Sequence, residues 1–172
     1  MKVIDNFLPP YIFERLRSSI MGEDIPWYYN EHILTRDLEF WKNNIGVDLP
    51  QFTHVLSEDD LFSDWFDLVD PILDKMSIKK LFKVKANLTT RTVFNRFTGY
   101  HVDWSDKSLI PPDANTSIFY MNTNNGGTKI KGYDTIESVA NRFVTFNSSS
   151  EHGGITCTDQ KRRVVLNFNY LL

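Results

Sequence analysis

The pattern of apolar residues along the chain changes near residue 81, and this change limits the folds that the chain can adopt. From there onward, apolar and β-branched residues come in short runs, with turn residues at 124–127, 148–150 and 153–154. Strands this short and closely spaced bury their apolar faces by pairing into packed sheets or a barrel. We therefore predict a mainly β fold, a double-sheet jelly roll, with strands at 82–88, 91–94, 117–121, 128–130, 143–146, 155–158 and 164–170.

The first half carries helical periodicity instead. Residues 10–21 and 59–76 each place their apolar side chains near one face of a helix, and Pro71 interrupts the second pattern. A chain of 172 residues is long enough for one core but short for two. We expect one domain, 1–172, in which helical and extended support at 1–80 buttresses a jelly-roll core at 81–172 that carries the functional site.

The composition limits the cellular compartment and the classes of binding partner that we expect. The only cysteine is Cys157, so no internal disulfide can form, and no apolar run approaches the length of a signal peptide or a membrane span. We expect a cytoplasmic protein without a membrane partner. A net charge of -3 gives no overall field to attract nucleic acid, and the lysine cluster Lys79, Lys80, Lys83 and Lys85 is expected to be a solvated edge.

Three side chains from the β region form a candidate metal site. His101 and Asp103 are two residues apart, and on an extended segment such residues project to the same side. The pair alone is weak evidence for a metal site, because a turn histidine beside a solvated aspartate gives the same sequence pattern. His152, at the far end of the β region, completes a set of two imidazoles and one carboxylate, which is typical of non-haem Fe(II) oxygenases.

The remaining candidates for chemistry are interpreted as structural. His32 and His54 have no carboxylate at same-face spacing and lie in the N-terminal half. Cys157 has no evident histidine partner, which favours a small strand residue over a thiolate nucleophile.

Two adjacent arginines precede the last strand. Arg162 and Arg163 must point to opposite faces, and alternation places Arg163 with Val165, Asn167 and Asn169. A guanidinium binds a carboxylate through two parallel charge-assisted hydrogen bonds, so the inward arginine is a candidate for a 2-oxo acid. Alternation alone does not decide which arginine points inward, and two exposed basic residues at a strand start remain the alternative.

These pieces, in this order, resemble the prolyl-4-hydroxylase-like branch of the Fe(II)/2-oxoglutarate oxygenases, especially its short bacterial and phage members. The resemblance covers roughly residues 84–170 and rests on GYHVDW (99–104), SIFYMN (117–122), GGT (126–128), NRFVTFNSSSEHGG (141–154) and RRVVLNFNY (162–170). It implies a double-stranded β-helix of cupin-like form in the cytoplasm of a bacterial or phage-infected cell. It also implies Fe(II) bound by His101, Asp103 and His152, with 2-oxoglutarate and O2 as co-substrates and ascorbate in support.

The resemblance assigns further roles. It favours Arg163 over Arg162 for the distal carboxylate of 2-oxoglutarate, and it gives Tyr120 a hydrogen bond to that carboxylate, with a core aromatic as the alternative. Asn87 and Arg91 would line the pocket by position, or are ordinary strand residues. Asp103 favours hydroxylation of an unactivated C–H, because related halogenases carry a small residue there.

Two other functions stay open on the sequence. One is a non-catalytic jelly-roll binding module in which the histidines and glycines serve turns. The other is a metal-dependent dioxygenase that does not use 2-oxoglutarate. The substrate is expected to be a small molecule or a peptide, such as a peptidyl proline or an amino acid, and the oligomeric state is not assigned.

Overall fold

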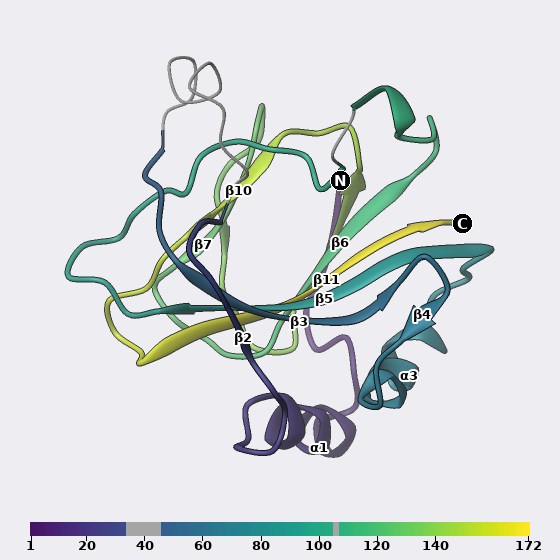
Figure 1. Ribbon diagram of the computed structural model, residues 1–172, viewed down its shortest axis with the longest axis horizontal. Coiled ribbons are helices and arrows are strands. Elements are labelled where there is room, and N and C mark those ends of the chain that lie inside the picture. Colours follow the sequence, from purple (N-terminus) through teal and green to yellow (C-terminus); the bar gives the residue numbers. More distant parts are fainter. Residues whose placement is uncertain (34–45, 105–106) are drawn as a thin grey trace.

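The computed structural model describes residues 1–33, 46–104 and 107–172, and most of its regular structure is β (Figure 1). Within these residues, eight strands form a large antiparallel sheet and three form a small one, which confirms the predicted mainly β jelly-roll architecture. The large sheet has the order β1 (Lys2–Ile4), β9 (Phe143–Asn147), β6 (Asn115–Tyr120), β11 (Arg162–Leu171), β5 (Lys80–Thr90), β3 (Gln51–Glu58) and β2 (Tyr28–Asn30), with β4 (Leu61–Phe62) paired to β3. The small sheet has the order β10 (His152–Ile155), β7 (Gly127–Ile130) and β8 (Ile136–Glu137).

Helices cover one face of the large sheet (Figure 1). The packed elements are α1 (Pro10–Ile20), the 3-10 helix η1 (Phe66–Val69) and α3 (Asp70–Leu73), while the 3-10 helix η2 (Lys107–Leu109) lies elsewhere. Phe13 and Ile20 of α1 join Val164, Leu166 and Phe168 of β11 in the main hydrophobic core. The expected buttressing of one outer face by N-terminal helices is therefore confirmed.

The opposite face of the large sheet turns toward the small sheet. A second apolar cluster fills part of this space, with Ile118 and Val165 from the large sheet meeting Ile130 of β7. The rest of the space is lined by polar side chains of β5 and β11. The fold thus leaves one polar pocket between an apolar cluster and the open edge of the jelly roll.

The helix predicted at 59–76 is mostly wrong. Asp59 and Asp60 both have positive φ, 49° and 64°, and they form the two-residue turn between β3 and β4. A turn of that type needs two left-handed residues, which no continuous helix can contain. Helical structure begins only at η1, and Pro71 lies in the first turn of α3, where a missing N–H is tolerated.

Two of the strand predictions are also wrong. Residues 91–94 lie in a loop, where Val93 is 85% exposed and Phe94 67% exposed, and the Arg91 and Thr92 N–H groups donate to the carbonyls of Lys161 and Cys157, which lie outside the strands. The strand predicted at 155–158 lies three residues earlier as β10, so the 153–154 pair belongs to a strand and not to a turn.

The N-terminal half supplies more of the sheet than its sequence indicates. β3 runs for eight residues and pairs with β5, and β1 pairs with β9. The segment between β1 and α1 is held by Asn141, whose side chain accepts from the Leu8 N–H and donates to the Leu8 carbonyl, both at 2.8 Å. Among the described residues, none of the helices is long and apolar enough to span a membrane.

Candidate metal centre and co-substrate pocket

His101, Asp103 and His152 converge in the pocket. Asp103 Oδ1 lies 3.8 Å from His101 Nε2 and 3.7 Å from His152 Nε2, and the three potential ligand atoms all lie within 4.8 Å of one another. Atoms that share a metal ion at bond lengths of about 2.0–2.2 Å are separated by roughly 3–4 Å. Two imidazoles and one carboxylate at this spacing can hold a divalent transition-metal ion with several coordination positions left for other ligands.

Backbone pairing brings the two histidines together. The His101 N–H donates to the His152 carbonyl and the His152 N–H donates to the His101 carbonyl, both at 2.9 Å. Residues paired in this way project their side chains to the same face, and the two ring centroids are 4.8 Å apart. Gly153 permits this approach, because a Cβ there would lie 2.0 Å from the Gly99 carbonyl oxygen.

The orientation of the His152 ring is fixed by a hydrogen bond at Nδ1. Its Nδ1 lies 3.1 Å from the Ser150 carbonyl oxygen, which can only accept a hydrogen bond. Nδ1 therefore carries the proton, and Nε2 directs a lone pair toward Asp103. The ring also packs edge-on against Phe146, at 4.9 Å between centroids.

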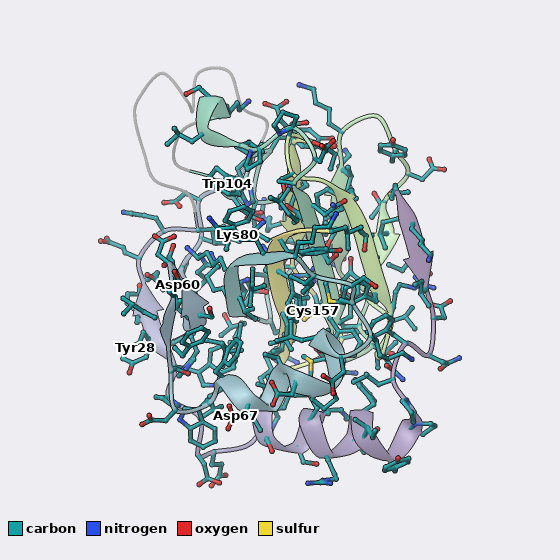
Figure 2. All side chains as sticks on the ribbon, turned by 90° about the vertical axis from the view of Figure 1, so that its right-hand side faces the viewer. Tyr28, Asp60, Asp67, Lys80, Trp104 and Cys157 are labelled. Atoms are coloured by element: carbon teal, nitrogen blue, oxygen red, sulfur yellow. The ribbon has the colours of Figure 1, made fainter. Side chains whose placement is uncertain are left out.

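Asp103 is held by two amides from β11. Its Oδ2 accepts hydrogen bonds from Asn167 Nδ2 at 3.0 Å and from Asn169 Nδ2 at 3.1 Å. With Oδ2 occupied, Oδ1 is the oxygen that faces the histidines. The adjacent Trp104 packs on Phe82 at 5.0 Å between ring centroids, near Lys80 and at the end of the molecule away from α1 (Figure 2).

Electrostatics give these groups the protonation states that metal binding needs. Burial, with repulsion from His152, lowers the pKa of His101 to about 4, so its imidazole is neutral at pH 7. Burial opposes ionisation of Asp103, but the attraction of His152, His101 and Lys85 and the Asn169 hydrogen bond bring its pKa down to about 2. A neutral imidazole and an ionised carboxylate are the forms that coordinate a cation.

Arg163 lies on the same wall of the pocket and is 6% exposed. Its Nε donates to Ser138 Oγ and its Nη2 to Thr128 Oγ1, each at 3.0 Å. Within the part of the chain that the structure describes, no carboxylate pairs with this guanidinium. A buried cation paired only with hydroxyls is costly, and an anionic ligand in the pocket would offset that cost.

The structure separates the two arginines as strand alternation requires. Arg162 lies on the helix-covered side and donates to the Met21 carbonyl, and it is not among the residues that line the pocket, so its position does not favour its candidate role in co-substrate binding. Tyr120 is fully buried, and its hydroxyl donates to Thr128 Oγ1 at 2.8 Å, while its ring lies 5.6 Å from the Arg163 guanidinium carbon. Asn87 lines the pocket, whereas Arg91 is exposed outside it.

Sequence reasoning missed three residues of the site. Lys85 lines the pocket and does not lie on the solvated edge that the sequence predicts, and the contacts of Asn167 and Asn169 to Asp103 are not predicted either. The detectable signal is alternation: on the face that also carries Arg163, β5 presents Lys85, Asn87 and Thr89, and β11 presents Asn167 and Asn169 after the apolar Val165.

The other histidines and the cysteine stay outside the site. His54 is buried between the Pro26 carbonyl and Ser63 Oγ, and His32 pairs with Asp48 at 2.8 Å, which supports the structural interpretation of both. Cys157 is buried just after β10 and not within a strand, with its Sγ toward the Gln160 carbonyl.

Comparisons with known proteins agree on the fold. No protein-family model matches the sequence, and no curated protein matches it. The chain is similar to the viral collagen prolyl hydroxylase of Paramecium Bursaria Chlorella virus-1 in its 2OG complex, with a TM-score of 0.61, 12% identity and coverage of 99% of this chain and 95% of that one.

Two further solved structures extend this similarity. The Trichoplax adhaerens prolyl hydroxylase in complex with a hypoxia-inducible-factor peptide has a TM-score of 0.62 at 11% identity, covering 98% of this chain and 82% of that one. Streptomyces hygroscopicus HygX, with nickel, 2-oxoglutarate and hygromycin B bound, has a TM-score of 0.58 at 11% identity, covering 98% and 81%. The chain therefore has the fold of the Fe(II)/2-oxoglutarate oxygenases, in agreement with the resemblance drawn from its motifs.

Proposed function

We propose that this protein is an Fe(II)- and 2-oxoglutarate-dependent dioxygenase that hydroxylates an unactivated C–H bond. His101, Asp103 and His152 would hold the iron, and Arg163 would bind the distal carboxylate of 2-oxoglutarate. The observation that carries the proposal is that one pocket is lined by a two-histidine, one-carboxylate cluster and by a buried arginine that has no acidic partner among the described residues. A metal alone would account only for the cluster and an anion alone only for the arginine, whereas a dicarboxylate that also binds a metal accounts for both.

The donor set fits Fe(II) on chemical grounds. Imidazole nitrogen and carboxylate oxygen suit this ion, and three ligands on one side leave room for co-substrate and oxygen. When bound, Fe(II) and 2-oxoglutarate activate O2, and the substrate C–H becomes C–OH while 2-oxoglutarate becomes succinate and carbon dioxide. The chemistry belongs to the metal and co-substrate, so the protein's contribution lies in binding, orientation and exclusion of water.

The chain's own residues perform these tasks in distinct places. Asn167 and Asn169 fix the carboxylate of Asp103, and the Ser150 carbonyl fixes the tautomer of His152. Thr128 links Tyr120 to Arg163, so the tyrosine supports the guanidinium through a shared hydroxyl. Ile118 and Val165 form the apolar side of the pocket, which limits water near the reacting atoms.

The substrate is proposed to be a small molecule or a peptide, with a peptidyl proline or an amino acid as the leading candidates. The similar solved structures include one with a bound peptide fragment and one with bound hygromycin B, so this fold accommodates both classes. A binding module without a metal has no use for two imidazoles gathered around a buried carboxylate. A dioxygenase that oxidises a chelated ligand directly has no use for Arg163.

The proposal is tested with purified protein, Fe(II), 2-oxoglutarate and ascorbate, measuring succinate release in the absence of substrate. Slow release is expected, and Asp103→Ala should abolish it together with Mn(II) binding by calorimetry. The matched control is Asp113→Ala, which removes an exposed carboxylate and should leave both unchanged. A wild-type protein that neither binds Mn(II) nor forms succinate would refute the assignment.

A further inference from the structure

Lys85 brings an unexpected positive charge into the pocket. It lies on β5 directly opposite Asn167 of β11, the residue whose amide donates to Asp103 Oδ2. The side chain is half-buried and contributes to the pocket lining, on the same face of the sheet as Asn87. Its position is therefore beside the candidate metal ligands and not on the solvated edge.

The ammonium of Lys85 has no partner of its own among the described residues. Lys83, two positions earlier, pairs with Glu58 at 2.5 Å, whereas Lys85 has neither a hydrogen bond nor an ion pair within 4.0 Å of any described group. Asp103, the carboxylate that attracts Lys85 most strongly, is engaged by Asn167 and Asn169 and faces the histidines. Lys85 is one of the residues that line the pocket, so its side chain is available to a ligand bound there.

When the charges of a site with bound metal and 2-oxoglutarate are added, one positive charge has no negative counterpart. A divalent cation, Lys85 and Arg163 would carry four positive charges, against one negative charge on Asp103 and two on 2-oxoglutarate. Strand spacing puts the backbone of Arg163 roughly 13 Å along β11 from Asn167, which pairs with Lys85, so the two cations enter the pocket from separate positions. The remaining positive charge lies on the Lys85 side.

We propose that the primary substrate carries a carboxylate that binds the ammonium of Lys85, with Asn87 beside it. This inference rests on the function proposed above and narrows its substrate class to carboxylic acids. A single ammonium next to neutral amides matches one negative charge better than a phosphate dianion. Because Lys85 adjoins Asp103, carbon atoms near the bound carboxylate would lie close to the iron.

The energetics of Lys85 favour such a partner. Burial lowers the pKa of Lys85, since the charged form loses hydration, and the attraction of Asp103 offsets this only in part. A bound carboxylate would restore the stabilisation of the ammonium. Metal binding strengthens the need, because a bound cation would offset the charge of Asp103, which is the strongest attraction on the lysine.

The test uses protein loaded with Mn(II) and 2-oxoglutarate, which does not turn over. Small aliphatic monocarboxylic acids are titrated against their own primary amides, and inorganic phosphate is titrated separately, with affinity read from paramagnetic relaxation of the ligand nuclei. At least one acid is expected to bind about 10-fold or more tightly than its amide, which corresponds to one charge-assisted contact. Phosphate is expected to bind no better than the acids.

Three variants locate the effect. Lys85→Met should reduce acid binding to the level of the amide, Lys85→Arg should retain the preference, and the matched control Lys83→Met should leave it unchanged. Thermal unfolding of each variant verifies that it is folded, and Lys85→Gln replaces Lys85→Met if the latter is not. Binding of 2-oxoglutarate to Lys85→Met should stay within a few-fold of the wild-type value.

The inference is overturned if no acid binds, if acids and amides bind alike, or if the preference survives in Lys85→Met. It is also overturned if Lys85→Met loses 2-oxoglutarate instead, which would make the lysine a co-substrate residue. Failure of the proposed function looks different, because the wild-type protein would then fail to bind Mn(II) and 2-oxoglutarate and would release no succinate.

Discussion

The two faces of β11 have opposite roles although they come from the same ten residues. On one face Val164, Leu166 and Phe168 are buried against the helices. On the other face, Arg163 and the asparagines bind side chains and carboxylates in the pocket. Burial of the apolar face stabilises the fold, while burial of the polar face costs free energy that only ligands and hydrogen bonds offset.

β5 repeats the division beside it. Val84, Ala86 and Leu88 belong to the main core, whereas Lys85 and Asn87 line the pocket. The large sheet therefore separates two roles. Substitutions on the helix side should change the free energy of unfolding, and substitutions on the pocket side should change the affinity for ligands. Substitutions and metal titrations on the two sides can test that separation directly.

The largest effect is expected on the helix side. Phe168→Ala removes a fully buried ring and should lower the free energy of unfolding by about 3–5 kcal/mol in urea titrations of the metal-free protein. Phe62→Ala, at a side chain that is 59% exposed, is the control and should change stability by about 0.5 kcal/mol or less. Similar losses in both variants would contradict the placement of the core.

Arg163→Met should separate binding from stability on the pocket side. Loss of a bidentate contact to a carboxylate, at about 1.5–3 kcal/mol for each hydrogen bond, should weaken 2-oxoglutarate binding about 100-fold or more by calorimetry. The free energy of unfolding should fall much less, because a buried guanidinium that is hydrogen-bonded only to hydroxyls among the described residues is itself costly. Arg162→Met, on the opposite face, should leave co-substrate binding near the wild-type value, and the reverse result would exchange the two roles.

Metal should stabilise the protein only through the pocket face. Free Mn(II) at 100 times its dissociation constant should raise the free energy of unfolding by about 2.7 kcal/mol, since it binds the folded state alone. A chelator should reverse the gain, and Asp103→Ala should show none. A gain that persists in Asp103→Ala would place the metal elsewhere.

The smallest effect is expected from the supporting amides. Asn167→Ala and Asn169→Ala each remove one donor to Asp103 and should weaken Mn(II) binding by about 10- to 100-fold. Asn115→Ala is the control, since that amide donates only to the nearby Asp113 carbonyl. Unchanged metal affinity in both pocket variants would mean that Asp103 is oriented by its loop alone.

Sequence reasoning succeeded where chemistry follows from alternation or from motif order. It placed Arg163 with Val165, Asn167 and Asn169, and it gathered His101, Asp103 and His152 into one set, as the structure has them. It failed where the outcome depends on a partner strand or a turn. Residues 91–94 have strand-like composition but lie in a loop, and the left-handed Asp59 and Asp60 form a turn at the start of a pattern that the apolar spacing alone predicts to be helical.

Local periodicity and side-chain chemistry are enough to set the alternation of polar and apolar side chains, the jelly-roll class and the identity of the candidate ligands. They do not set which arginine turns inward. It is the folded chain that points Arg163 into the pocket, while Arg162 donates to the Met21 carbonyl. The folded chain also places Lys85 near Asp103 with no ion-pair partner among the described residues. The inward face of a strand depends on what packs on either side of it. That packing joins residues far apart in the chain, as Gly153 and Gly99 do where they bring the two histidines together.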